Sequence, residues 1–387
     1  MKRLLYLVAV LFIVNTAVAQ DGYVFKDEIR LPTTTVKDQY ASGTCWAFST
    51  ISFIESEMVR KGMKLKDVPD ISEMYVVRKC YEEKAVKYIR MHGTLNFGGG
   101  GSFYDVFWTL KNFGFVPEGV YAGLNYGKDA HNHSELDAVL KAYVDALKDE
   151  SGLTTAWLAG FNGILDAYLG NDPTSFEYNG KKYTPRTFAD EVVKLNPDDY
   201  VSITSYTHHP FFTQFAIEVQ DNWQWSMSYN VPMNDMIKIA DNALKNGYTI
   251  AWGADVSEVY FSHRDGVAVV PDLDMKELVK TERSRWEKTD KDKYNLNKPG
   301  KEKEITQQMR QDAFDNFQTT DDHGLHIVGL AKDQNGAEYY IVKNSWNTDN
   351  PYDGYVYVSK AFFLYKTMNF VVHKDAIPSD LRTKLGI

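Results

Sequence analysis

Cysteine is scarce in this sequence: Cys45 and Cys80 are the only two among 387 residues. This count excludes a fold organised by disulfides and leaves one bridge between the two residues as the alternative. We expect Cys45 to stay free, because its sequence context is that of a reactive thiol. We expect Cys80 to be a small buried hydrophobic residue near a helix end.

An excess of positive charge is also lacking. The chain has 43 lysines and arginines against 52 aspartates and glutamates, which gives a net charge of −9 with neutral histidines. An acidic balance argues against nucleic acid or an anionic membrane as the main partner. After the amino-terminal segment, no run approaches the ~18 apolar residues of a membrane span, so we expect no membrane contact from the mature chain.

The first residues have the pattern of a secretory signal peptide. Lys2 and Arg3 precede the apolar stretch Leu4–Val14, and Ala17-Val18-Ala19 forms a small-residue cleavage site. A single transmembrane anchor is the alternative, but the apolar stretch is short for a span of ~20 residues. We therefore expect residues 1–19 to be removed and residues 20–387 to be exported, either to a periplasm or out of the cell.

Helical periodicity dominates the first part of the chain, and strand patterns dominate the last part. The predicted helices span residues 44–61, 72–83, 103–113, 135–148, 186–195 and 233–245. The predicted strands span residues 248–256, 266–270, 326–331, 338–343 and 354–358, with a charge-rich surface segment at 273–316. This order, with 44% hydrophobic residues to build a core, predicts an α+β protein whose two lobes share one long cleft.

Cys45 stands where a helix is predicted to begin, directly after the turn-forming Ser42-Gly43-Thr44. Unpaired amide groups and the helix dipole place partial positive charge at such a position. That charge favours the thiolate, which is the nucleophilic form of cysteine. Cys45 is therefore a candidate nucleophile that needs a base and a group to orient the base.

His323 is the best candidate for the base. It lies where a loop enters the apolar strand that follows Gly324, and Asn344 ends another strand 21 positions later. An amide oxygen there is suited to accept the imidazole N–H and fix its tautomer, and Trp346 is placed to shield that bond from water. His326 is a weaker competitor, because it should point to the other side of the strand.

We assign the remaining histidines no chemical role. His131 and His133 are expected to be surface polar residues. His208 and His209 are expected in a loop with no carboxylate cluster at ligand spacing. The isolated histidines are His92, His263 and His373. No metal site is predicted.

Three segments resemble the active-site motifs of papain-like cysteine peptidases, in the family's order. The first is Gln39-Tyr-Ala-Ser-Gly-Thr-Cys45-Trp-Ala-Phe-Ser49. The second is Asp322-His323 with Val328-Gly329, and the third is Lys343-Asn344-Ser345-Trp346. The resemblance implies a papain-like two-lobed fold, with a helical lobe at about 40–130, a helical insertion at about 131–200 and a β-barrel-like lobe at about 201–375.

The match is closer to the bleomycin hydrolase and aminopeptidase C branch. Cys45 and His323 are 278 residues apart, against ~130–150 in papain. The helical insertion and the segments at 230–232, 252–256 and 319–323 also resemble that branch. The resemblance implies a peptidase that acts on peptides, and it implies a homo-oligomer. The predicted signal peptide departs from this branch, whose members are mostly cytosolic.

The resemblance also implies site roles. Cys45 attacks the carbonyl carbon, His323 carries the proton and Asn344 orients His323. The side chain of Gln39 and the backbone N–H of Cys45 stabilise the oxyanion. The residues implied to line the cleft and contact substrate are Gly100, Gly101 and Trp346. No cofactor is implied, and no Gly-Lys-Ser/Thr follows the glycines, which excludes a phosphate loop.

The sequence departs from the family at several points. Ser42 replaces a cysteine that papain itself uses in a disulfide, and Asn347 replaces the usual glycine after Asn-Ser-Trp. Bleomycin hydrolases have a carboxy-terminal tail in the cleft that restricts cleavage to substrate amino termini, and we expect Ile387 to fall short of such a tail. An endopeptidase with an open cleft, acyl transfer to other amines, and a peptide-binding protein without turnover are therefore the alternatives to an aminopeptidase.

Overall fold

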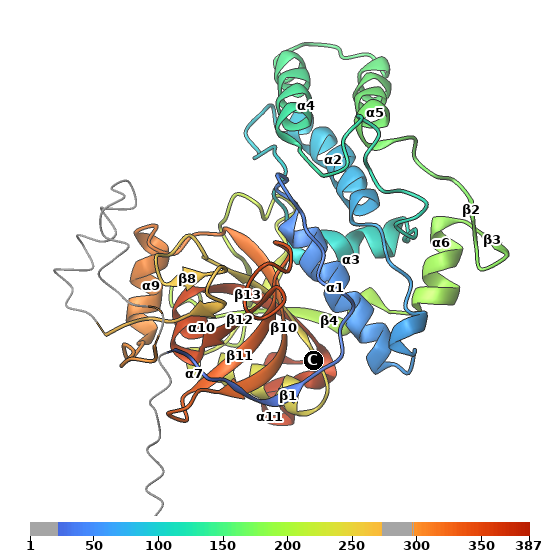
Figure 1. Cartoon of the computed structure of the whole chain (residues 1–387). Coiled ribbons are helices and arrows are strands. Elements are labelled where there is room, and N and C mark those ends of the chain that lie inside the picture. Colours follow the sequence, from blue (N-terminus) through green and yellow to red (C-terminus); the bar gives the residue numbers. More distant parts are fainter. Residues whose placement is uncertain (1–21, 273–295, 297) are drawn as a thin grey trace, which may run out of the picture.

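The computed structural model describes residues 22–272, 296 and 298–387. The predicted signal peptide and residues 273–295 of the charged segment lie outside these residues. Figure 1 shows helices gathered on one side of the molecule and a large sheet, with its own helices, on the other. This arrangement confirms the α+β class predicted from the order of the patterns.

The helical side is built from the first half of the chain. Its helices are α1 (Cys45–Arg60), α2 (Glu73–Arg90), α3 (Phe103–Asn112), α4 (Ser134–Leu147), α5 (Ala156–Leu169) and α6 (Pro185–Phe188). Shorter turns are η1 (Leu65–Asp67), η2 (Ala189–Val193) and η3 (Pro197–Asp199), and a small hairpin pairs β2 (Phe176–Tyr178) with β3 (Lys181–Tyr183).

The start of α2 confirms the predicted cap, but its end does not match the prediction. The Ser72 side chain accepts a hydrogen bond of 3.0 Å from the Tyr75 N–H. The helix then continues to Arg90, because Ala85 and Tyr88 keep an apolar face toward the core. Cys80 consequently lies in the middle of α2 and not near its end, although it is buried as expected.

The helix predicted at 186–195 is present as α6 followed directly by the π-helix η2, which ends at Val193. Thr184 and Pro185 begin it as predicted, and the Thr184 side chain accepts a bond from the Thr187 N–H. After α6 the chain widens into the π-turn η2, and Lys194 ends it with a φ of 56°. Left-handed backbone of this kind stops helical hydrogen bonding.

The sheet side is formed mainly by the second half of the chain. Its strands are β1 (Lys26–Arg30), β4 (Tyr200–Thr204), β5 (Gln214–Ala216), β6 (Met227–Asn230), β7 (Ile250–Ala254), β8 (Phe261–Ser262), β9 (Val267–Ala268), β10 (His323–Lys332), β11 (Glu338–Lys343), β12 (Tyr355–Ser359) and β13 (Thr367–His373). Its helices are α7 (Met233–Lys245), α9 (Gln307–Asp315), α10 (Lys360–Lys366) and α11 (Ser379–Leu385), with the turn η5 (Lys374–Ala376). The observed bounds of α7 match the prediction.

The described strands join in the order β5-β6-β4-β13-β7-β10-β11-β12-β9-β8, and β1 pairs with β10. This path is open at both ends, so the expected barrel-like lobe is an open sheet among the described residues. β10 lies at the centre, between β7 and β11 and against β1. His323 is the first residue of β10, and its pairing with Ala254 of β7 fixes the start of the strand.

Helix α1 packs directly onto β10, and a glycine allows it to do so. A methyl group on Gly324 would lie 2.7 Å from Ser49 Oγ and 3.2 Å from Trp46 Cα. The first distance is too short for a carbon atom and the second is tight, so a larger residue would require α1 or its side chains to shift. The close packing brings the start of α1, with Cys45, next to the start of β10, with His323.

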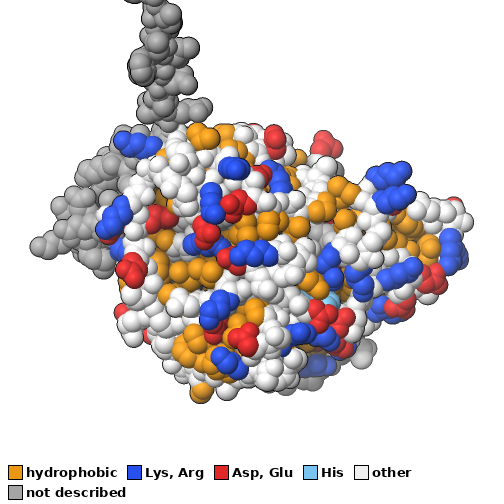
Figure 2. All heavy atoms as spheres, turned by 90° about the horizontal axis from the view of Figure 1, so that it is seen from below, with side chains coloured by type: hydrophobic (Ala, Val, Ile, Leu, Met, Phe, Trp, Pro, Cys, Tyr) orange, Lys and Arg blue, Asp and Glu red, His pale blue; other side chains and the backbone are white. Residues whose placement is uncertain are grey.

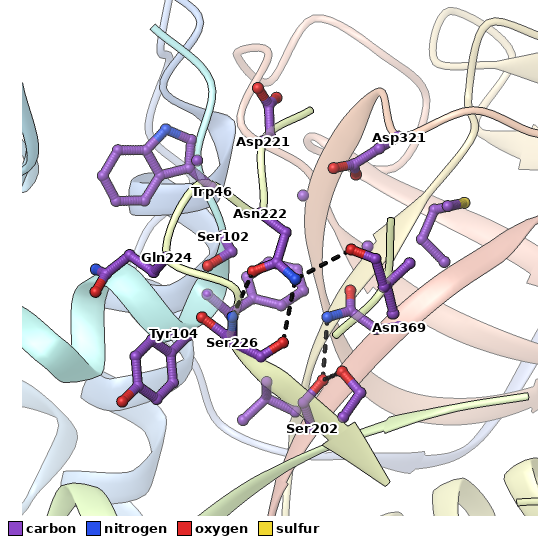
Figure 3. Close-up of a pocket in the computed structure, with 18 of the residues that line it drawn as sticks. Trp46, Ser102, Tyr104, Ser202, Asp221, Asn222, Gln224, Ser226, Asp321 and Asn369 are labelled. Carbon is purple, nitrogen blue, oxygen red and sulfur yellow. Dashed lines mark hydrogen bonds between the residues drawn. The ribbon is translucent and has the colours of Figure 1, made fainter. Parts of the chain in front are cut away.

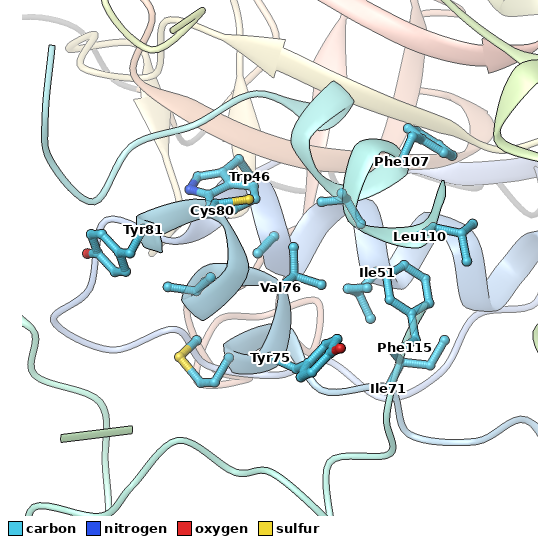
Figure 4. Packing of buried hydrophobic residues seen from close by; sticks show 14 of the residues in the cluster. Trp46, Ile51, Ile71, Tyr75, Val76, Cys80, Tyr81, Phe107, Leu110 and Phe115 are labelled. Carbon is cyan, nitrogen blue, oxygen red and sulfur yellow. The ribbon is translucent and has the colours of Figure 1, made fainter. Parts of the chain in front are cut away.

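The two sides have separate hydrophobic cores. The helical core surrounds α1, and Figure 4 shows Ile51 of α1 packed against Val76 of α2 and Phe115. A second cluster fills the space between the sheet and its helices, and includes Trp252 and Phe363. Burial of this apolar area is the main stabilising contribution to both sides.

The surface mixes charges of both signs. Figure 2 shows lysines and arginines side by side with aspartates and glutamates across the face it presents. In the described part of the chain, no helix has the length and apolar character needed to cross a membrane.

Candidate active site

Cys45 is the first residue of α1 and lines a cleft between the two sides of the molecule. The backbone N–H groups of Trp46 and Gly324 face its sulfur. These groups and the start of the helix favour negative charge on the sulfur. Cys80 lies elsewhere, with its Sγ 3.7 Å from Thr109 Oγ1, and both cysteines are free, which excludes the disulfide alternative.

His323 and Asn344 meet because β10 and β11 pair. His323 Nε2 lies 2.7 Å from Asn344 Oδ1. The same Oδ1 accepts a bond of 2.8 Å from the Ser345 backbone N–H, which identifies this end of the amide as the oxygen. Nε2 therefore carries the hydrogen, and Nδ1 is the ring nitrogen left to exchange a proton.

Trp346 covers the imidazole. The ring centroids of His323 and Trp346 are 4.4 Å apart, with an interplanar angle of 31°. His323 and Asn344 are both buried, with 5% and 3% of their surface exposed. The bond between them is therefore largely withdrawn from water, which strengthens it.

Gln39 is held beside the site from two directions. Its Nε2 donates to the Ser42 carbonyl at 2.8 Å, and its Oε1 accepts from Ser345 Oγ at 2.7 Å. Its backbone N–H also donates to the Ser345 carbonyl at 3.0 Å. These contacts leave the second hydrogen of the Gln39 amide for a ligand in the cleft, which Gln39 lines.

Gly100 and Gly101 lie in the cleft wall opposite β10. The loop is fixed by Trp46, whose Nε1 donates to the Gly99 carbonyl at 3.0 Å. A methyl group on Gly101 would lie 2.8 Å from Trp46, so the backbone approaches that indole closely. Bare backbone at this wall is available to pair with an extended peptide.

The cleft has a volume of about 810 Å³ and is lined from both sides of the molecule. Six of the seven predicted site residues line it: Gln39, Cys45, Gly100, Gly101, His323 and Trp346. Asn344 stands behind His323. Figure 3 shows the far part of this cleft, where Tyr104, Ser202 and Asn369 face the space, and it also labels Asp221 and Asp321.

Burial shapes the charge states at the site. Burial is the largest cause that raises the pKa of Cys45 to about 12, and the carboxylates of Asp321 and Asp221 contribute in the same direction. Burial likewise lowers the pKa of His323 to about 4, against the effect of its bond to Asn344. A single charge on either side chain is therefore disfavoured. A state in which both side chains are charged together, as thiolate and imidazolium, would let each charge offset the other's loss of water.

His263 belongs to the site, although it was expected to be an isolated histidine without a chemical role. Its Nδ1 lies 3.1 Å from Asn344 Nδ2, so it accepts from the amide whose oxygen faces His323. Its ring also packs against Trp346, with centroids 5.5 Å apart. Asn350 Nδ2 donates a hydrogen bond of 2.9 Å to the backbone carbonyl of His263. The contact joins residues 81 positions apart, and no local pattern announces it.

Two other histidine predictions are wrong. His131 and His133 are buried, with 7% and 0% of their surface exposed, and burial lowers the pKa of each to about 4. His208 and His209 are joined by a carboxylate, that of Glu218, which follows them by ten and nine positions. Among the described residues, these three form the one group whose side chains are arranged to hold a metal ion.

Comparison with known proteins identifies the class. The family model described as "Papain family cysteine protease" matches residues 26–162 and 301–370, and the "Peptidase C1-like family" model matches residues 167–299. The chain belongs to the papain family of cysteine proteases. It is a cysteine-type peptidase, and its substrates are peptides.

Similar proteins point to the branch predicted from the sequence. Aminopeptidase G of Lactobacillus delbrueckii subsp. lactis is 23% identical over 92% of this chain and 84% of its own length. Aminopeptidase C of Listeria monocytogenes is 23% identical over the same two shares. The crystal structure of PepW from Lactobacillus rhamnosis superposes with a TM-score of 0.70 at 20% identity, over 93% of this chain and 84% of that one. The last comparison confirms the papain-like fold.

Proposed function

We propose that this protein is an exported cysteine aminopeptidase, with Cys45 as nucleophile and His323 as proton carrier. The observation that carries the proposal is the 2.7 Å contact of His323 Nε2 with Asn344 Oδ1, at the edge of the cleft that holds Cys45. This contact leaves Nδ1 of His323 to take the thiol proton and later to give it up.

Acylation begins from the thiolate–imidazolium pair. The Cys45 sulfur attacks the scissile carbonyl carbon, and the carbonyl oxygen becomes an oxyanion. As the C–N bond breaks, the imidazolium of His323 gives its proton to the leaving amine. The product is an acyl-enzyme thioester with a neutral imidazole, and the carboxy-terminal part of the substrate departs.

Deacylation restores the pair. His323 takes a proton from water while the water oxygen attacks the thioester carbon. The C–S bond then breaks, the carboxylic acid leaves, and Cys45 and His323 are again thiolate and imidazolium. Asn344 keeps the imidazole in one tautomer throughout, because its oxygen is fixed by the Ser345 N–H.

The oxyanion is stabilised by two donors. One is the backbone N–H of Cys45 at the start of α1, and the other is the remaining amide hydrogen of Gln39. Removal of one such donor costs about 10²–10³-fold in kcat. The two existing bonds of Gln39 hold its amide in place before substrate binds, so no reorganisation is needed.

The named relatives support cleavage from the amino terminus, since two of them are aminopeptidases. One observation favours the endopeptidase alternative. In the described chain, no residue after Val371 lines the cleft, and α11 packs through Leu381 and Leu385 into the core of the sheet side. The chain's own last helix therefore does not close the cleft.

The test compares free and blocked substrates. The purified protein should release dye from alanyl-aminomethylcoumarin at least about tenfold faster than from its N-acetyl form, because a desolvated ion pair or charged hydrogen bond is worth about 1.5–3 kcal/mol. Cys45→Ala should abolish both rates while leaving the fold intact. Equal rates on the two substrates indicate an endopeptidase, and no rate on any peptide indicates a binding protein. Added amine nucleophiles that appear in the product indicate acyl transfer.

Export is supported by the sequence pattern of residues 1–19. Expression of the full chain in a bacterial host should give a secreted or periplasmic protein whose amino terminus, read by sequencing, is Gln20 or a close neighbour. Recovery of the uncleaved chain from the cytoplasm contradicts this part of the proposal.

A further inference from the structure

Two aspartates line the cleft near Cys45, and neither forms an ion pair among the described residues. Asp221 lies over Gly100, so closely that a methyl group on that glycine would overlap the carboxylate. Asp321 comes two residues before His323. Figure 3 shows both at the same end of the pocket. They also lie close enough to Cys45 for their charges to raise the pKa of its thiol.

Neither carboxylate is well satisfied by the protein. Asp221 accepts one bond, from Asn96 Nδ2 at 3.2 Å. Lys84 is the nearby cation, but its ammonium is already bonded to the Gly98 carbonyl at 2.9 Å and to that of Gly100. For Asp321 the described residues provide no hydrogen-bond partner. Its neighbour Asp322, in contrast, accepts from Ser257 N at 2.8 Å and from Thr320 Oγ1 at 3.0 Å.

Two close carboxylates in a poorly hydrated cleft repel each other and disfavour their own ionisation. Burial, followed by the charges of Asp221 and Asp322, raises the pKa of Asp321 to about 7, and burial raises that of Asp221. A cation with several N–H donors that binds between Asp221 and Asp321 removes the repulsion between the two carboxylates and supplies the hydrogen bonds that they lack. It also removes the negative field that disfavours the thiolate of Cys45. Substrate binding and activation of the nucleophile are thereby coupled.

We propose that Asp221 and Asp321 bind a cationic group of the substrate, adjacent to the residue whose carbonyl Cys45 attacks. This inference rests on the proposed function, and it assigns the group as the free α-ammonium of the substrate. The same two carboxylates suit a second source, a lysine or arginine side chain on the residue that precedes the one whose carbonyl is attacked. Both sources share the chemistry of an N–H-rich cation, and substrates can distinguish them.

The experiment uses three substrates with the same dye: alanyl-, acetyl-alanyl- and acetyl-lysyl-alanyl-aminomethylcoumarin. Asp221→Asn and Asp321→Asn should each lower kcat/KM on the free-amino substrate by about 10- to 100-fold, mainly through KM, because a charged hydrogen bond is lost. The rate on the acetyl-alanyl substrate should not fall, because that substrate offers no cation and the thiolate of Cys45 is opposed by one charge fewer. Asp198→Asn is the matched control, since Asp198 lines the same cleft but is paired with Lys111 at 2.6 Å.

A second readout separates binding from a merely structural role. Removal of either negative charge should lower the apparent pKa at which iodoacetamide alkylates Cys45 in the free enzyme, since both charges oppose the thiolate. His323, the other titratable group beside the sulfur, is unchanged in these variants. Near-ultraviolet circular dichroism verifies that each variant is folded.

The outcomes distinguish this inference from the proposed function. Loss confined to the acetyl-lysyl substrate keeps the cation site but assigns it to a side chain, which overturns the assignment to the α-ammonium. Unchanged kinetics on all three substrates and an unchanged alkylation profile overturn the cation site. In that case the ratio of free to blocked rates in the wild type still decides whether the enzyme is an aminopeptidase.

An independent observation concerns His208, His209 and Glu218, outside the cleft. The Nε2 atoms of the two histidines lie 3.2 Å and 3.1 Å from separate oxygens of Glu218. All three potential ligand atoms lie within 4.8 Å of one another. Ligands bound to a tetrahedral zinc ion at ~2.0–2.1 Å lie about 3.4 Å apart, so the side chains need little movement.

The surroundings orient these imidazoles. His209 stacks on Phe215 with centroids 4.2 Å apart. Nδ1 of His208 lies 3.0 Å from Nε2 and 3.3 Å from Oε1 of Gln311. The amide can therefore serve either tautomer of His208, including the one that leaves Nε2 free for a metal. The Thr207 N–H and Asp315 hold the amide itself, at 2.6 Å and 2.9 Å.

We infer that these three side chains bind a divalent transition metal such as Zn²⁺, with an exposed fourth position for water. Calorimetric titration of Zn²⁺ into the Cys45→Ala protein avoids binding to the active-site thiol. One equivalent should bind, and Glu218→Gln or His209→Phe should weaken it at least about tenfold. His209→Phe retains the stacking on Phe215. Unchanged affinity in both variants, or no stoichiometric binding in the parent, overturns the site.

Discussion

The two faces of β10 each present a histidine, and the two differ in what surrounds them. His323 faces Asn344 and lines the cleft. His326, three residues on, faces α1, where its Nδ1 lies 2.9 Å from Ser52 Oγ. Both are buried, and burial lowers the pKa of both. Burial and a perturbed pKa therefore do not distinguish a reactive histidine from a structural one. Access to the cleft and a partner that fixes the tautomer do.

Exchange of the two histidines for alanine tests this contrast most strongly. His323→Ala should lower kcat/KM by about 10⁴-fold or more, as expected when a nucleophile loses its proton carrier. His326→Ala should keep the activity of the folded protein within about threefold and lower only its stability. Peptide-dye kinetics on protein verified as folded measures both. Similar losses in the two variants contradict the assignment.

The two cysteines extend the comparison to the nucleophile. Iodoacetamide should label Cys45 at least about 100-fold faster than Cys80 near neutral pH, because only Cys45 has access to solvent and an imidazole to take its proton. Mass spectrometry of peptides after timed quenching gives the two rates. Comparable labelling of the two residues is inconsistent with an activated Cys45.

The contact behind Asn344 predicts a smaller effect. His263 accepts from Asn344 Nδ2, so His263→Phe should lower kcat by about tenfold with little change in KM. His263→Gln retains an acceptor and should lose less. Because burial lowers the pKa of His263, the ring is neutral at pH 7, and protonation at acid pH removes the acceptor. The acid limb of the kcat profile should therefore shift in His263→Phe. If neither kcat nor the acid limb of its pH profile changes in His263→Phe, Asn344 does not need the hydrogen bond to His263.

His326 predicts the smallest effect, on stability and not on activity. Its pKa in the folded protein lies well below the unfolded value of 6.5, so the unfolded state binds the proton first as the pH falls. The wild type consequently loses stability below pH 6.5 through this residue. The stability gap between wild type and His326→Gln should narrow by up to about 1.4 kcal/mol for each pH unit below that value. Urea unfolding at pH 7 and pH 5.5 measures the gap, and a constant gap refutes the argument.

Local patterns in the sequence predicted much of the fold. The Ser72 cap, the bounds of α7 and the α+β order were all foreseeable, because each depends on neighbouring residues. The extension of α2 past Cys80 and the change to a π-turn after Phe188 were not. Contacts with the core extend α2, and a left-handed residue, Lys194, ends the π-turn η2.

The site divides in the same way. The motifs around Cys45, His323 and Asn344 are local and readable, whereas the partners that complete the site come from far away. Gln39 and Ser345 are 306 positions apart, and His263 and Asn344 are 81 apart. The predicted exposure of His131 was wrong for a related reason. Its ring packs against Phe48 of α1, a contact between residues that are distant in the sequence.

The distance between the Cys45 sulfur and the His323 imidazole depends on how closely α1 packs against the sheet. Gly324 sets how closely α1 packs on the sheet, because it has a hydrogen atom where every other residue has a Cβ carbon. A methyl group at this position would press on Ser49 Oγ and on Trp46 Cα, and we expect it to displace the start of α1, which carries Cys45, from the start of β10, which carries His323. The activity of this enzyme therefore depends on how closely two elements pack. A search for variants with reduced activity can begin at Gly324, a residue that has no side chain.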